Sequence, residues 1–188
     1  MGPIMAAAQR DLRLISPYFV PGEEGVRWLG GMRARGVEVG VLTNSLAAND
    51  VVAVHGGYAG YRKPLLEAGV ELFELMPHGQ SNSSLFGSSG ASLHTKAFAV
   101  DGETGFIGSF NMDPRSVSLN TEMGVVFQDR EVTAELLKSY ASKTAAANSY
   151  RVALEQGALR WQDGSVEPPK VWTHEPETSW WRRATARV

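Results

Sequence analysis

The chain has 188 residues, 43% apolar and 20% charged, which is the composition of a folded globular protein of about one domain. Eighteen basic residues against twenty acidic ones give a formal net charge of −2, so a broad nucleic-acid-binding surface is not expected. The absence of cysteine excludes disulfides, thiolate metal sites and cysteine nucleophiles. No apolar run approaches the roughly 18 residues that span a bilayer, and residues 1–9 lack the basic start of a secretory signal.

The first part of the chain alternates between strand and helix patterns. A short helix at 5–10 precedes strands predicted at 11–16, 37–41 and 70–75 and helices predicted at 21–36 and 49–68. Pro64 lies inside the second long helix and is expected to kink it. This strand–helix–strand order is typical of a sheet with parallel members and covering helices.

The second part begins with a Ser- and Gly-rich segment, 79–92, which reads as a mobile loop and a candidate active-site flap. The elements expected after it are strands at 93–100, 104–110 and 122–128, a helix at 131–147, and short strands at 150–154 and 159–162. We expect one α/β domain over 1–166, an α-β-α sandwich whose mixed sheet has helices on both faces. A tail rich in Trp, Arg and Pro occupies 167–188.

The segment that indicates chemistry is a predicted hairpin carrying His94, Lys96, Ser109 and Asn111. Alternate side chains on a strand share a face, so His94 and Lys96 are expected to project into one space. Ser109 and Asn111 are also two apart, and the hairpin brings them alongside. Asp101 has the opposite parity and lies at the Asp-Gly turn, where it is expected to organise the turn rather than contact substrate.

This combination of side chains suits a phosphodiester. Lys96 supplies a positive charge, and Ser109 and Asn111 supply neutral donors to the non-bridging oxygens. His94 can attack phosphorus or transfer protons. A nucleophilic imidazole needs an acceptor on its other nitrogen, and Glu122 is the expected acceptor.

The spacing of His94, Lys96, Asp101, Gly108, Ser109 and Asn111 resembles the HKD motif of the phospholipase D superfamily. Within that superfamily the flanks resemble the C-terminal half of bacterial cardiolipin synthases, especially the C type. The flanking segments that carry this resemblance are 16–21, 43–50, 108–116 and 119–124.

The resemblance implies a phosphatidyltransferase with the superfamily's α-β-α sandwich. Two HKD halves build one site: one His forms a phosphohistidine, the other protonates the leaving alcohol, and an acceptor alcohol then resolves the intermediate. Phosphatidylglycerol and a second phospholipid are the implied substrates, with no metal or organic cofactor. The implied site residues are His94, Lys96, Ser109, Asn111 and Glu122, with Asp101 and Gly108 structural. The implied location is peripheral, at the bacterial inner membrane.

The chain holds one HKD motif, because His55, His78 and His174 are not followed by a Lys two residues later. A second half-site is therefore expected from an N-terminal domain, which makes the chain a C-terminal half, or from a second copy. The alternatives are a homodimeric, metal-independent phosphodiesterase or nuclease of the same superfamily, and an inactive half-domain that only binds its partner half.

Other candidate residues have two interpretations each. His55 and Tyr58 lie in a helix rich in small residues, which suits close packing against the sheet, whereas the family resemblance implies that they help to form the substrate cleft. Arg115 fits a head-group contact or a structural ion pair. The Trp and Arg residues of the tail fit a membrane contact or packing on the domain, and packing is slightly preferred. His78 and His174 have no partners at metal-ligand spacing, so no metal site is expected.

Overall fold

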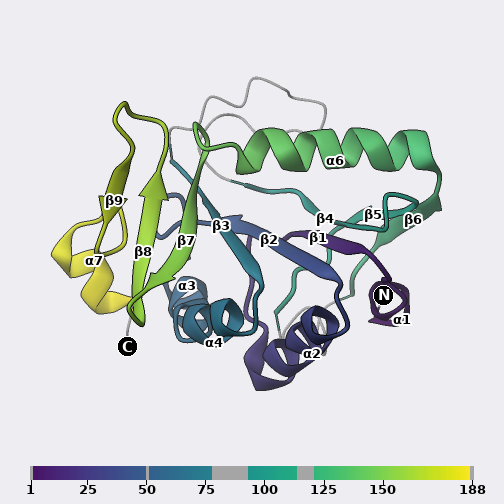
Figure 1. Cartoon of the computed structure of the whole chain (residues 1–188), viewed down its shortest axis with the longest axis horizontal. Helices are drawn as coiled ribbons and strands as arrows, with labels where there is room; N and C mark the ends of the chain where they lie inside the picture. The colour runs from purple at the N-terminus through teal and green to yellow at the C-terminus, as the bar shows by residue number, and fades with distance from the viewer. Residues whose placement is uncertain (1, 50, 78–92, 114–120, 187–188) are drawn as a thin grey trace.

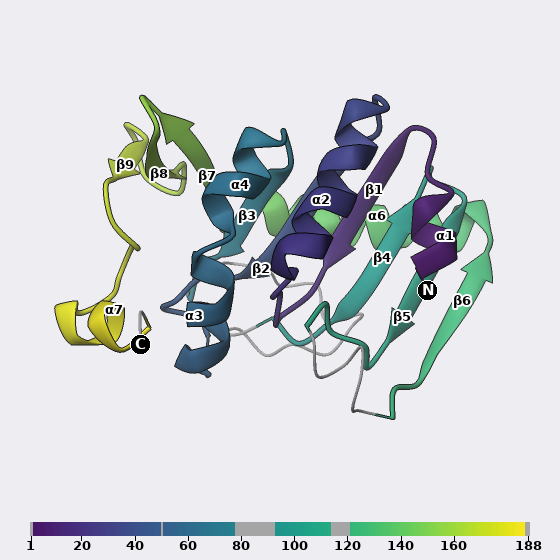
Figure 2. The same cartoon turned by 90° about the horizontal axis from the view of Figure 1, so that it is seen from below.

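The computed structural model describes residues 2–49, 51–77, 93–113 and 121–186. Nine strands in these ranges form one sheet in the order β6-β5-β4-β1-β2-β3-β7-β8-β9 (Figures 1 and 2). The strands are β1 (Asp11–Ile15), β2 (Glu38–Asn44), β3 (Glu71–Leu75), β4 (Lys96–Val100), β5 (Thr104–Gly108), β6 (Gly124–Gln128), β7 (Ser149–Glu155), β8 (Ala158–Asp163) and β9 (Lys170–Trp172).

Helices cover both faces of the sheet, as the sequence predicts. The described helices are α1 (Gly2–Ala6), α2 (Gly22–Ala34), α3 (Val52–Ala59), α4 (Arg62–Glu67), α6 (Arg130–Thr144) and α7 (Trp180–Thr185). Figure 1 shows α6 along one face and α2, α3 and α4 on the other, with α7 beyond the β7-β8-β9 end. None of the described helices is both long and apolar enough to cross a membrane.

The sheet is mixed. Strand β1 pairs in parallel with β2, and β2 with β3, whereas every other pairing is antiparallel. The edge at which β1, β2 and β3 end is called the carboxyl edge here. Because β4 and β6 run the opposite way, they begin at this edge, and β5 ends there. The two ends of the HKD hairpin therefore lie at the carboxyl edge.

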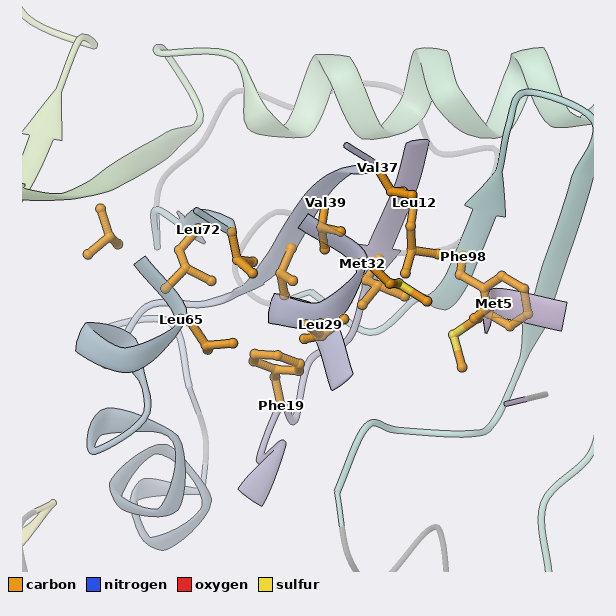
Figure 3. Close-up of a cluster of buried hydrophobic side chains, with 14 of the residues drawn as sticks. Met5, Leu12, Phe19, Leu29, Met32, Val37, Val39, Leu65, Leu72 and Phe98 are labelled. Atoms are coloured by element: carbon orange, nitrogen blue, oxygen red, sulfur yellow. The ribbon is translucent and has the colours of Figure 1, made fainter. Parts of the chain in front are cut away.

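Two apolar layers hold the helices on the sheet. On one face, Leu12 and Val39 pack with Leu29 and Met32 of α2 and Leu65 of α4 (Figure 3). On the other face, Leu136 and Tyr140 of α6 pack on strand residues that include Ile15, Leu42 and Ala97. Helix α6 begins at Asp129, whose carboxylate accepts hydrogen bonds from the N–H groups of the first turn.

Three expectations about elements need correction. The single kinked helix expected over 49–68 is two helices, and Pro64 lies in the first turn of the second, where its missing N–H costs nothing. Strand β9 lies within the predicted tail and pairs with β8, a strand the sequence pattern did not indicate. Strand β4 begins at Lys96 rather than at residue 93. The loop at 79–92 lies outside the described residues, and the domain boundary at 166 stays a prediction.

Candidate active site

The HKD hairpin is placed by strand register. Lys96, the first residue of β4, pairs with Gly108, the last residue of β5, and Gly108 pairs with Gly124 of β6. Residues 109–113 and 121–123 extend these strands past the carboxyl edge. The expectation that the hairpin brings Ser109 beside the His94–Lys96 segment is therefore met by the pairing of β4 with β5.

His94 lies two residues before β4 and is exposed, whereas Lys96 is 9% exposed. The Lys96 Nζ donates a hydrogen bond to the backbone oxygen of His94 at 2.8 Å. Since the strand starts only at Lys96, shared-face alternation does not place His94; this hydrogen bond ties the two residues together instead. A cation held against the backbone of a residue whose imidazole is exposed suits an anionic substrate that approaches from solvent.

The segment before His94 is held by Asn44, the last residue of β2. The Leu93 N–H donates to Asn44 Oδ1 at 2.9 Å, and Asn44 Nδ2 donates to the Leu93 oxygen at 3.3 Å. This two-way amide contact joins the end of β2 to the residue that precedes His94. Asn44 is fully buried, so the contact is shielded from water.

Ser109 and Glu122 form a direct pair. The Ser109 hydroxyl donates to the Glu122 carboxylate and accepts from the Met123 N–H at 2.9 Å. The Ser109 N–H also donates to the Met123 oxygen at 2.8 Å. Glu122 lies two residues before β6 rather than inside a strand. Its predicted hydrogen bond to His94 stays a prediction, because the contact described for its carboxylate is the one to Ser109.

Asn111 follows Ser109 at the same edge. Its Oδ1 is buried and has no hydrogen-bond partner among the described residues. The next residue, Met112, is fixed: its N–H donates to Ser16 Oγ at 3.0 Å, and its oxygen accepts from the Val20 N–H at 2.7 Å. A fixed backbone beside an unpaired amide oxygen is an arrangement that can orient a polar substrate group. Arg115 lies outside the described residues.

Asp101 lies at the β4–β5 turn with its carboxylate against the start of β1. Its carboxylate accepts from the N–H groups of Gln9 at 2.9 Å, Arg10 at 2.7 Å and Asp11 at 3.0 Å. Burial opposes ionisation of the carboxylate, but these three backbone hydrogen bonds outweigh it and hold the pKa of Asp101 below its usual range. Asp101 therefore connects the β4–β5 turn to the start of β1.

Gly108 is required by the approach of β6. A Cβ at Gly108 would lie 2.5 Å from the Met123 oxygen and 2.7 Å from the Gly124 Cα. Both are backbone atoms, which cannot move aside without separating the strands. A side chain at Gly108 is therefore excluded by the close approach of β6.

His55 and Tyr58 of α3 belong to a buried network on the β3–β7 side of the sheet, away from the HKD hairpin. His55 Nε2 is 2.9 Å from Glu175 Oε1, and the Arg62 guanidinium reaches Glu74 at 2.7 Å and Glu175 at 2.6 Å. Tyr58 lies under that guanidinium, with its ring centroid 4.7 Å from Arg62 Cζ. Both His55 and Tyr58 are almost fully buried, which favours the packing interpretation; a substrate contact stays a prediction.

The electrostatics of this network follow from its burial. Burial opposes the charge of Arg62, but Glu74, Tyr58 and Glu175 outweigh it and raise the pKa of the guanidinium. Burial likewise opposes the ionised Glu175, but the His55 hydrogen bond and the Arg62 charge lower the pKa of this carboxyl to about 2. The network is a structural ion pair that ties the segment around Glu175 to α3 and α4.

From the sequence, Asn44 is expected to cap a loop, and no positioning role is predicted for Ser16 or for the Arg62 network. Asn44 and Ser16 each follow or end a parallel strand, the position at which ligand clefts of open α/β sheets form. For Asn44 this position favours a ligand cleft, but loop capping is the simpler interpretation of the same pattern. The partners of Arg62 are separated by up to 113 residues, so no local pattern could indicate them.

The sequence of this chain is similar to those of known proteins. A sequence profile described as "Cardiolipin synthase, PLD-like domain" matches residues 3–143. The chain belongs to this family. It is 44% identical to cardiolipin synthase C of Escherichia coli (strain K12) over 98% of its own length and 40% of that relative's. It is 31% identical to cardiolipin synthase A of Proteus mirabilis over 82% of its length and 28% of that relative's. The chain thus spans less than half of these curated relatives.

Solved structures show the same fold at low sequence identity. Nuc, a phospholipase D family member from Salmonella typhimurium, is 18% identical with a TM-score of 0.60, covering 80% of this chain and 86% of that one. Phosphatidylserine synthase from Haemophilus influenzae is 15% identical with a TM-score of 0.55, covering 94% of this chain and 37% of that one. The family profile confirms the predicted superfamily, and these structures confirm the mixed α/β fold.

Proposed function

We propose that this chain is one half-site of a phospholipase D-type phosphatidyltransferase that makes cardiolipin. The observation that carries the proposal is the cluster at the carboxyl edge: exposed His94, Lys96 bonded to it, and the Ser109–Glu122 pair beside them. Family membership and the 44% identity to a cardiolipin synthase support the lipid substrate over a nucleic acid. Phosphatidylglycerol and a second phospholipid are the proposed substrates.

The proposed reaction has two displacements at one phosphorus. A nitrogen of one active-site His attacks phosphorus, the phosphorus–oxygen bond to the leaving alcohol breaks, and the second His gives that alcohol its proton. An acceptor hydroxyl then attacks the phosphohistidine, passes its proton to the second His, and the phosphorus–nitrogen bond breaks. Lys96 balances the charge of the phosphoryl oxygens, and Ser109 and Asn111 orient them.

A second histidine is needed, so the proposal includes a second half-site. The chain covers 40% of the E. coli relative, which leaves room in that relative for another half. We infer that the partner half-site faces His94 across the carboxyl edge. The reaction proposed needs no metal, and we expect unchanged rates in the presence of a chelator. Because the proposed substrates are membrane lipids, we also propose that the protein associates peripherally with the bacterial inner membrane.

A chimera tests the proposal. This chain replaces the matching residues of the E. coli relative, and cardiolipin formation is measured by mass spectrometry with phosphatidylglycerol vesicles. We expect the chimera to form cardiolipin and the His94→Ala chimera to lose activity by about 10³-fold, as removal of a residue that transfers protons or bonds covalently does. Arg27→Gln, an exposed change on α2, is the control and should leave the rate unchanged. A folded His94→Ala chimera that is as active as the unchanged chimera would refute the proposal.

The homodimeric phosphodiesterase is the second candidate, because Nuc shares the fold over 86% of its length. Light scattering on this chain separates the two. A mass near twice 20.4 kDa, with cleavage of a phosphodiester by the chain alone, would favour the homodimer. Under the main proposal we expect a monomer that is inactive until a second half-site is supplied.

A further inference from the structure

A groove with a volume of about 650 Å³ lies at the β7-β8-β9 end of the molecule. It is lined by α3, α4, the β7–β8 turn, strand β8, residues 173–175 and α7. The HKD residues lie in or next to β4 and β5, and Glu122 lies just before β6, at the other end of the strand order. None of the residues His94, Lys96, Ser109, Asn111 and Glu122 lines the groove.

The lining of this groove is cationic. Arg62, Lys63, Arg160 and Arg183 all line it, and Glu175 is the one carboxylate among the described lining residues. That carboxylate is already paired with Arg62 and His55. The groove thus presents an excess of positive charge on a chain whose net charge is −2.

Two of these cations have weak protein partners. Lys63 Nζ is 3.8 Å from Glu67, and Arg160 Nε is 3.8 Å from Glu155, each at a partly exposed site where an ion pair contributes little. Lys63 is 54% exposed at its side chain. The Lys63 side chain can turn toward an anion in the groove without breaking a buried contact, whereas the Arg160 guanidinium also donates to the Leu159 oxygen at 2.9 Å and can reach an anion from where it is held.

An aromatic pair stands next to the groove on α7. Trp180 and Trp181 are 60% and 70% exposed, and their ring centroids lie 4.1 Å apart. Arg183 of the same helix lines the groove. The helix is fixed to the domain, because the Arg182 guanidinium donates to the backbone oxygens of Leu46 and Asn49. Exposed Trp next to a half-buried Arg, with the exposed Lys63 on the same groove, suits binding at the interface of an anionic bilayer.

We propose that this groove binds the phosphate-bearing head group of an anionic phospholipid while Trp180 and Trp181 insert into the bilayer interface. The occupant is a membrane lipid rather than a free anion, since a free anion gives the exposed Trp pair nothing to contact. The site is separate from the HKD site and does not depend on its chemistry. It would hold the domain on the membrane between turnovers.

Vesicle flotation tests the proposal. The chain is mixed with vesicles of equimolar phosphatidylglycerol and phosphatidylcholine, or of phosphatidylcholine alone. We expect binding to the anionic vesicles and a roughly tenfold loss of affinity in the Lys63→Gln/Arg160→Gln double variant, since each cation near an anionic surface contributes measurably. Trp180→Ala/Trp181→Ala should weaken binding to a similar extent. The Arg27→Gln/Arg35→Gln double variant removes the same charge from α2 and its C-terminal cap and should bind as the unchanged chain does.

The possible outcomes distinguish a membrane lipid from a soluble anion, and they distinguish the groove proposal from the catalytic proposal. Binding of soluble glycerol 3-phosphate by calorimetry without vesicle flotation would overturn the membrane assignment. If the groove variant and the α2 variant lose vesicle affinity equally, the effect depends on net charge alone, and the proposed lipid site in the groove is refuted. His94→Ala should leave flotation unchanged, so failure of the catalytic proposal and failure of this one are told apart.

Discussion

At the scale of single residues, Asp101 shows how a motif carboxylate can serve the fold. It accepts three backbone N–H groups at the start of β1. We expect Asp101→Asn to lower the free energy of unfolding by about 2 kcal/mol, the range for hydrogen bonds to a charged group. Urea unfolding monitored by circular dichroism measures it. Glu103→Gln in the same turn is the matched control and should change little, since Glu103 pairs at an exposed site.

The pH dependence of that effect has a definite sign. The pKa of Asp101 is lowered by folding from 3.8, so its contribution is complete above 3.8 and is lost as the pH falls through the lower folded value. The difference in the free energy of unfolding between the unchanged chain and Asp101→Asn should therefore be constant near neutral pH and disappear in acid. A gap that widens in acid would contradict the assignment.

The residues of the candidate site were predictable from the motif, but their contacts were not. Spacing indicated His94, Lys96, Ser109 and Asn111. The Ser109–Glu122 pair spans 13 residues, and the Asn44–Leu93 contact spans 49. Such contacts depend on strand register, which a sequence pattern does not specify.

At the scale of elements, β6 approaches β5 so closely at Gly108 that a larger residue does not fit at this position. Gly108→Ala places a Cβ against backbone atoms of Met123 and Gly124, so we expect a loss of more than about 2 kcal/mol in the free energy of unfolding. Gly31→Ala is the matched substitution, because a Cβ there meets nothing within 4 Å inside α2. It should stabilise the chain by about 0.5–1 kcal/mol. Thermal unfolding of both variants measures the contrast, and equal effects would contradict it.

Hydrophobic periodicity predicted most strands and helices to within a few residues, because alternating and 3.6-residue apolar patterns can be recognised within a single strand or helix. It failed where the pattern is weak. Helices α3 and α4 separate at Gly60 and Tyr61 within one apolar stretch. Strand β9 has three residues, too few to show alternation.

At the scale of the whole molecule, Glu175 joins the C-terminal segment to α3 and α4. We expect Glu175→Gln to lower the free energy of unfolding by about 2 kcal/mol and to speed hydrogen exchange in α7. The pKa of Glu175 is about 2 in the folded chain and 4.5 as a free side chain. The effect should be complete above pH 4.5 and fade toward pH 2. Glu155→Gln, an exposed carboxylate on β7, is the control, and unchanged exchange in α7 would contradict the assignment.

The strand order has a consequence for synthesis on the ribosome. Strands β1 to β3 leave the ribosome before β4 and β7, yet β1 needs β4 and β3 needs β7 to cover their outer edges. Until residue 155 has left the exit tunnel, the nascent parallel core offers at least one uncovered edge to other chains. Nascent chains stopped before β7 should therefore be bound by chaperones more strongly than chains stopped after it.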